Sequence, residues 1–257
     1  MSRTKIAAAA LILLTIATGW IWAVYALRFR VHPDVQLDRI SSAHPGARVS
    51  GVVRLDVRAF YDSRDFAPAW VNERNLEPRV DAALQVLDAA AAHGLKPEDY
   101  AVWTLRADRD ALLATAAEKR DSSDYTNALL DFDVRITSAL LTLGHDVAIG
   151  RTPPADFDPL WRSRRDPPNL PRTLARAIDT NLSTWLDAIE PPHAEYRALK
   201  SALADPDRLA ATGRDDAASV IAANMERWRW VPDDFGDRHF YVNIPSFTLV
   251  ARRARAN

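Results

Sequence analysis

The sequence has 257 residues, of which 48% are apolar and 26% are charged, and its formal net charge is -1. Such a chain can bury a large core, and the lack of a basic excess argues against a nucleic-acid-binding protein. The 257 residues include no cysteine, so they supply no disulfide, no thiolate metal site and no thiolate nucleophile.

The N-terminal part of the chain holds an apolar run. Residues 6–27 carry no charge and are about as long as the roughly 20 residues that a helix needs to cross the hydrocarbon core of a bilayer. Trp20 and Trp22 lie near the end of this run, as interfacial aromatic residues do. A cleaved signal peptide is the alternative, but the run is long for one. We therefore expect a membrane anchor over residues 1–30, with membrane contact through residues 6–27.

Residues 31–50 contain several Pro, Ser and Gly residues with mixed charges, which predicts a linker. The stretch 51–61 fits either a short strand or the start of a helix. From about residue 75 to 230, apolar residues recur at helical spacing, which predicts a mainly α fold. We assign residues 51–235 to this helical domain.

Three helices within this region are defined by their apolar residues. The first begins after Asn75, shows an apolar face and ends near Gly94; that face comprises Val80, Leu84, Leu87 and Ala91. The second spans residues 108–119. The third spans residues 121–143 with Gly144 as its stop, and its length predicts the central core helix. Further helices are expected between residues 171 and 203.

The last helix leads into a strand pattern. Ile221, Met225 and Trp228 form one apolar face, and the polar faces carry Glu226, Arg227 and Arg229. Pro232 stops the helix and the following Asp and Gly residues predict a turn. Strand-forming residues then dominate, namely Phe240, Tyr241, Val242 and Ile244, and residues 247–250 continue this strand or form a second one. We interpret residues 236–257 as the truncated start of a β-domain.

Five groups of short motifs carry a resemblance to a known family. They are Phe60-Tyr61 with Pro68-Ala69-Trp70, His93-Gly94-Leu95 with Pro97-Glu98-Asp99-Tyr100, Gly150-Arg151-Thr152-Pro153, Pro191 with His193, Tyr196 and Leu199, and Asn224–Trp230 with Gly236-Asp237-Arg238 and Val242–Pro245. This set resembles the helical scaffold of murein L,D-transpeptidases, together with the segment that leads from this scaffold into the catalytic domain. The resemblance implies a role in peptidoglycan metabolism.

Two departures from that family shape the expected function. Between Leu203 and Val220 the sequence has no room for the small peptidoglycan-binding module of relatives, and after Val250 it lacks the domain with the catalytic Cys. We expect a membrane-anchored, scaffold-type protein without catalytic activity of its own. The alternatives are a truncated L,D-transpeptidase chain of cell-wall biogenesis and a helical interaction protein of the envelope. Expected partners are the inner membrane and, through the resemblance, peptidoglycan or cell-wall enzymes.

The orientation in the membrane has two opposing indications. Basic residues are more numerous after the apolar run than before it, which by the positive-inside rule alone would keep the folded domain in the cytoplasm. The resemblance implies a periplasmic domain on a single-pass inner-membrane anchor, and long translocated domains weaken the charge rule. We therefore expect the folded domain in the periplasm.

The sequence shows no catalytic, cofactor or metal site. It contains no G-x-S-x-G motif and no phosphate-binding glycine loop. The histidines lack metal-ligand spacing and are each expected at the surface or as caps; they are His32, His44, His93, His145, His193 and His239. The pair Asp131 and Asp133 points to different sides of a helix, and the pair Asp233 and Asp234 fits turn chemistry.

One set of residues is expected to contact another domain or a partner, namely Trp228, Trp230, Phe240, Tyr241, Ile244 and Phe247. A strand in this region without a following β-domain has free backbone groups at its edge. Two outcomes are open. The strand folds back on the helical domain, for example by pairing with residues around 49–57, or it stays exposed and recruits a partner by strand addition.

Overall fold

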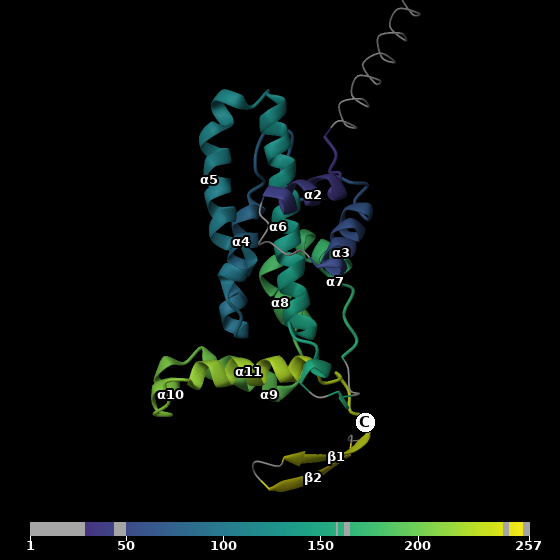
Figure 1. The fold of residues 1–257 in the computed structure, drawn as a ribbon, viewed down its shortest axis with the longest axis vertical. Coiled ribbons are helices and arrows are strands. Elements are labelled where there is room, and N and C mark those ends of the chain that lie inside the picture. The colour runs from purple at the N-terminus through teal and green to yellow at the C-terminus, as the bar shows by residue number, and fades with distance from the viewer. Residues whose placement is uncertain (1–28, 44–49, 158, 162–164, 244–246, 254–257) are drawn as a thin grey trace, which may run out of the picture. The chain divides into compact units, whose positions relative to one another are not determined.

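The computed structural model describes residues 29–43, 50–157, 159–161, 165–243 and 247–253. These residues are mainly helical and end in a two-stranded antiparallel sheet (Figure 1), which confirms the expected mainly α fold with a short C-terminal β segment. The chain divides into two compact units, and each takes more than one segment of the sequence.

The first unit comprises residues 1–88, 97–142 and 170–183. Its helices, including the part of α6 that it contains, are α2 (Pro33–Ala43), α3 (Gly51–Asp62), α4 (Arg79–Asp88), η2 (Pro97–Tyr100), α5 (Val102–Lys119), α6 (Ser123–Ile149), α7 (Leu170–Asp179) and η4 (Leu182–Thr184). The second unit comprises residues 89–96, 143–169 and 184–257. Its elements, beside the end of α6, are η1 (Ala89–His93), η3 (Pro154–Asp156), α8 (Trp185–Ile189), α9 (Ala194–Leu203), α10 (Pro206–Ala210), α11 (Ala217–Arg229), β1 (Arg238–Asn243) and β2 (Thr248–Arg253).

Helix α2 lies inside the range expected to be a linker. Val31 and Leu37 are fully buried, and Gln36 accepts the backbone N–H of His32 at 3.0 Å. The composition of residues 31–50 is polar on average, but Val31 is buried just before helix α2, and Leu37 is buried on one side of this helix, which begins at Pro33. Proline is tolerated there because the first helical N–H has no partner within the helix.

Residues 51–62 form α3 and not a strand. Ser50 caps this helix, since its side chain accepts the N–H of Val53 at 3.2 Å. Val53, Val57 and Phe60 face the core at helical spacing. The alternative in which the C-terminal strand pairs with residues 49–57 is therefore wrong, because from residue 51 onward that segment is helical.

Three expected helix limits differ from the observed ones. Helix α5 begins at Val102, six residues before the expected start at residue 108. After Asp88 the first helix tightens into the 3-10 turn η1, which buries Ala90 and leaves Ala91 exposed. Helix α6 continues past Gly144 to Ile149, so Gly144 is not its stop. A Cβ at Gly144 would lie 2.6 Å from the Trp185 ring, so this glycine allows the close approach of a large aromatic side chain.

Strands β1 and β2 form an antiparallel hairpin whose register pairs Phe240 with Ala251 and Val242 with Leu249. Among the described residues these two strands pair only with each other. Residues 248–250 therefore belong to a second strand and not to a continuation of the first, and Phe247 lies in the turn before it.

The expected membrane anchor at residues 6–27 lies outside the described residues. Among the helices that the structure does describe, none combines the length and apolarity required to span a bilayer.

Candidate functional site

A buried ion pair on α11 forms the centre of the second unit. The side chain of Arg229 is 1% exposed and donates to Glu226 Oε2 at 2.7 Å, one turn earlier on the helix. It also donates to the backbone oxygen of His93 at 2.5 Å and to the Tyr196 hydroxyl at 3.2 Å. The sequence placed Arg229 on a polar face, which is wrong because a charge with these partners can be buried.

The second oxygen of Glu226 binds the turn that follows α6. Glu226 Oε1 accepts the backbone N–H groups of Arg151 at 2.7 Å and Thr152 at 2.9 Å. Gly150 adopts a φ of +89°, and a Cβ there would lie 2.7 Å from Glu226 Oε1. Only glycine fits this position without strain, so the Gly150-Arg151-Thr152 turn is shaped to hold the carboxylate.

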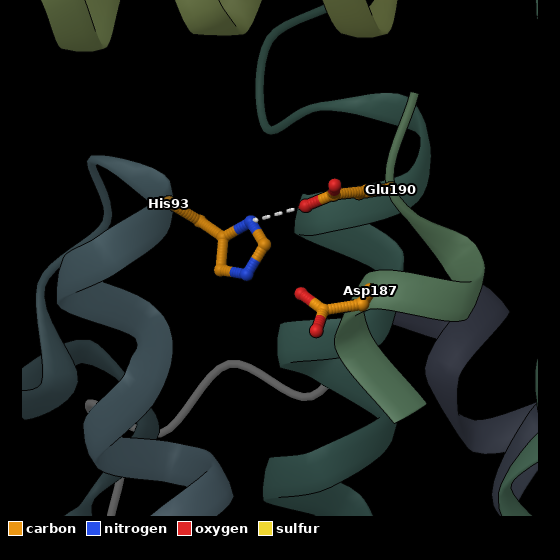
Figure 2. A group of neighbouring side chains, drawn as sticks. All are labelled: His93, Asp187 and Glu190. Atoms are coloured by element: carbon orange, nitrogen blue, oxygen red, sulfur yellow. Dashed lines mark ion pairs between the residues drawn. The ribbon is translucent and has the colours of Figure 1, made fainter. Parts of the chain in front are cut away.

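His93 is buried beside this ion pair, contrary to the expectation of a surface or capping residue. Its Nδ1 atom lies 3.0 Å from the Tyr196 hydroxyl. Burial, followed by the positive charges of Lys200 and Arg229, lowers the pKa of His93 to about 3. The imidazole is therefore neutral near pH 7, and its 3.7 Å contact with Glu190 Oε2, drawn in Figure 2, is an ion pair only after protonation.

His93, Asp187 and Glu190 have potential metal-ligand atoms that all lie within 4.8 Å of one another (Figure 2). A cation from the chain itself already reaches both carboxylates, because Lys200 Nζ donates to Asp187 at 2.6 Å and to Glu190 at 2.8 Å. Burial opposes the charge of Lys200, but the hydrogen bonds to Asp187 and Glu190 and the negative charges of these carboxylates together outweigh burial and raise the pKa of Lys200. The Lys200 ammonium thus serves as the positive charge of this cluster.

The turn between α11 and β1 is held by two side chains from other segments. Arg165 is 6% exposed, forms an ion pair with Asp233, and donates to the backbone oxygens of Ala148, Ile189 and Glu190. His193 Nε2 lies 3.0 Å from the backbone oxygen of Pro232. The start of the hairpin segment is therefore attached to the scaffold at two consecutive residues.

Four rings form a series along the same route. The ring centroids of Trp228 and His193 are 5.0 Å apart, those of His193 and Phe235 are 5.3 Å apart, and those of Phe235 and His239 are 5.1 Å apart. These are ordinary distances for interacting rings. The series connects α11 with β1 through the turn.

The residues expected to contact a partner fall into two groups. Trp228 is half-buried and Trp230 is buried, with the rings of Phe157 and Trp161 at 5.7 and 5.8 Å from Trp230. Both tryptophans therefore pack against other residues of the second unit. The rest of the set lies on the hairpin or at its turn, where Phe240 is 74% exposed, Phe247 is 95% exposed and Tyr241 is half-buried, while Ile244 lies outside the described residues.

One face of the hairpin is apolar and open to solvent. Register and alternation place Phe240, Val242 and Leu249 on the same face, and they are 74%, 61% and 66% exposed. An isolated two-stranded hairpin is marginally stable in water, and a contiguous exposed apolar patch marks an interaction site. This face, defined by these three residues, is called the hairpin face below.

A separate buried carboxylate organises the first unit. Asp133 accepts the backbone N–H groups of Ala69, Trp70 and Val71 at 3.0, 2.6 and 3.1 Å. It also accepts the hydroxyl of Tyr61 at 2.6 Å. Burial raises the pKa of Asp133 to about 6, although these hydrogen bonds oppose the shift. Asp133 thus joins the Phe60-Tyr61 and Pro68-Ala69-Trp70 motifs, which indicates a structural role.

Comparison with family models identifies the scaffold. A family described as the Scaffold domain matches residues 55–203, which is more than half of the chain, and this domain is the helical scaffold of L,D-transpeptidases. The chain therefore belongs to the Scaffold domain family. The match covers the motifs up to Tyr196 and does not extend to α11 or the hairpin. Comparisons with curated proteins and with solved structures give no significant match.

Proposed function

We propose that this protein is a non-catalytic scaffold of the L,D-transpeptidase type that presents its C-terminal hairpin to a cell-wall enzyme. The proposal rests on a contrast between the start of the hairpin segment and the hairpin face. Its start is attached through Asp233 and Pro232, whereas the hairpin face is open. A β-sheet partner could add a strand to the edge of such a hairpin and cover its exposed apolar face.

The chemistry of the residues supports a structural role and not a catalytic one. L,D-transpeptidases of this resemblance act through a cysteine thiolate, and the 257 residues contain no cysteine. The two buried centres described above, at Asp133 and Arg229, are occupied by internal hydrogen bonds. The partner that the proposal names is therefore an enzyme that supplies the thiolate.

The sequence and the family support a proposed location. We propose that residues 6–27 anchor the protein in the inner membrane and that the helical domain lies in the periplasm, where peptidoglycan is accessible. The apolar, uncharged run supports the anchor, and membership in the Scaffold domain family supports the periplasmic side.

The experiment is a cross-linking assay in which an isolated, thiol-bearing L,D-transpeptidase catalytic domain acts on muropeptides with and without this protein. We expect the protein alone to form no L,D-crosslink and no covalent adduct with a carbapenem, and to bind the catalytic domain. The variant Val242→Asp places a charge on the hairpin face and should abolish binding.

The matched control is Leu113→Asp on α5, because Leu113 is 55% exposed and lies outside the hairpin. This variant should bind as the unmodified protein does. A carbapenem adduct on the protein itself would refute the non-catalytic role. Equal binding by Val242→Asp and the unmodified protein would refute the role of the hairpin face.

A further inference from the structure

Helices α2 and α3 form a pair with exposed apolar side chains. Val35 on α2 is 54% exposed, and Val52 and Leu55 on α3 are 53% and 70% exposed. Val52 and Leu55 are three residues apart and lie on one side of α3, away from the side that buries Val53 and Val57. These three residues, Val35, Val52 and Leu55, are called the outer patch.

The two helices are linked by ion pairs. Arg54 pairs with Asp38 at 2.5 Å, and Arg58 pairs with Asp34 at 3.6 Å. Within each of these two pairs the opposite charges balance one another. A partner for this surface is therefore selected by its apolar character and not by its charge.

The position of helices α2 and α3 in the chain indicates what contacts the outer patch. Val31 is fully buried in the first unit, and its N–H donates to the backbone oxygen of Phe66 at 2.9 Å. Only four peptide links separate Val31 from residue 27, the end of the apolar run, and four extended residues reach at most roughly 14 Å. If the run lies in a bilayer, the start of α2 is held close to that bilayer's surface.

We propose that the outer patch rests on the lipid surface, with Val35, Val52 and Leu55 inserted at the boundary between headgroups and acyl chains. This inference rests on the proposed anchor. The contact is apolar, as for helices that lie in a membrane interface. Because the neighbouring charges are paired, the contact forms on zwitterionic lipid as well as on anionic lipid.

The absence of cysteine in the sequence makes a site-specific test straightforward. The full-length variant Leu55→Cys is labelled with an environment-sensitive fluorophore and reconstituted into phosphatidylcholine vesicles, with and without phosphatidylglycerol. The control is Leu113→Cys on α5, at a site with a similar degree of exposure. Lipids carrying a nitroxide near the headgroup should quench the Leu55 probe roughly twofold or more, because interfacial side chains insert several Å. They should leave the Leu113 probe unchanged.

Flotation of the same samples separates this inference from the anchor. Protein that floats with the vesicles but shows equal quenching at both positions would overturn the contact of the outer patch and leave the anchor intact. Protein that does not float would overturn both. A spectral shift of the Leu55 probe without quenching by lipid nitroxides would show that a second copy of the protein covers the patch, and would also overturn the inference.

Discussion

Glu226 and Arg229 lie three residues apart on α11, and the 2.7 Å ion pair between them connects α11 with three other segments of the chain. Glu226 reaches the turn after α6, and Arg229 reaches η1 and α9. Removing one partner of a buried ion pair leaves the other charge buried without compensation. The resulting loss of stability is larger than the net stability that the intact pair contributes.

We predict that Glu226→Ala lowers the free energy of unfolding by about 3–5 kcal/mol, because Arg229 and two backbone N–H groups lose their acceptor. Arg227→Ala, on the exposed side of the same helix, should change it by less than about 0.5 kcal/mol. Urea denaturation measures both. Equal effects of the two substitutions would show that the network does not stabilise the fold.

Asp133→Asn tests the buried carboxylate of the first unit. The amide has one acceptor oxygen where the carboxylate has two, and its NH2 group would face backbone donors. We expect a loss of about 2–3 kcal/mol in the free energy of unfolding. The control is Asp131→Asn, two residues before Asp133 on α6. It removes an exposed ion pair with Arg39 and should lower the free energy of unfolding by at most about 1 kcal/mol. A larger effect at Asp131 than at Asp133 would contradict this assignment.

His93 makes stability depend on pH in a defined direction. Its pKa is lowered to about 3 in the folded protein and is near 6.5 in the unfolded chain. The stability from the neutral imidazole is thus present above pH 6.5 and is lost as the pH falls towards 3. At pH 5 this group alone should reduce the free energy of unfolding by about 2 kcal/mol.

The variant His93→Gln cannot titrate, so its free energy of unfolding should depend less steeply on pH between 6.5 and 4. Parallel denaturation series at several pH values measure the difference between the two proteins. If both curves have the same slope in this range, His93 is not buried in the neutral form.

Lys200→Met should convert the carboxylate cluster into a metal site. Without the ammonium, the carboxylates of Asp187 and Glu190 lose their internal cation. A divalent cation such as Zn²⁺ can then bind them together with the neutral His93 ring, whose Nδ1 atom would exchange its contact with the Tyr196 hydroxyl. We expect Zn²⁺ to raise the melting temperature of this variant and not that of the unmodified protein. Adding His93→Ala should remove the gain, and a gain that persists in this double variant would exclude His93 as a ligand.

The sequence predicted the elements better than the contacts between them. Helical periodicity defined most helices, and the change of period after Pro232 indicated the strands. The sequence did not reveal that Gly144 lies inside α6. A glycine that ends a helix cannot be told in one sequence from a glycine that leaves space for a neighbouring side chain, here that of Trp185. The resemblance marked Phe60-Tyr61 and Trp70, but not the Asp133 carboxylate that joins them.

The buried ionisable side chains were the least predictable part of the site. Arg229 and His93 lie within recognised motifs, yet periodicity placed Arg229 on a polar face and base rates placed His93 at the surface. Burial of either depends on partners more than 30 residues away in the sequence, such as Tyr196 for Arg229. Arg165 lies in none of the motifs, and no local pattern reports its contacts with three backbone carbonyl groups.

We propose that the contacts of Arg165 with Asp233 and of His193 with Pro232 hold the hairpin in a fixed orientation relative to α11. Spin labels at Ala223→Cys on α11 and Leu249→Cys on β2, both exposed positions, allow the distance between the two elements to be measured by pulsed electron paramagnetic resonance. We predict a narrow distance distribution that broadens when Arg165→Met removes the ion pair with Asp233. A broad distribution in the protein with Arg165 intact would contradict the claim, because the hairpin would then move independently of α11.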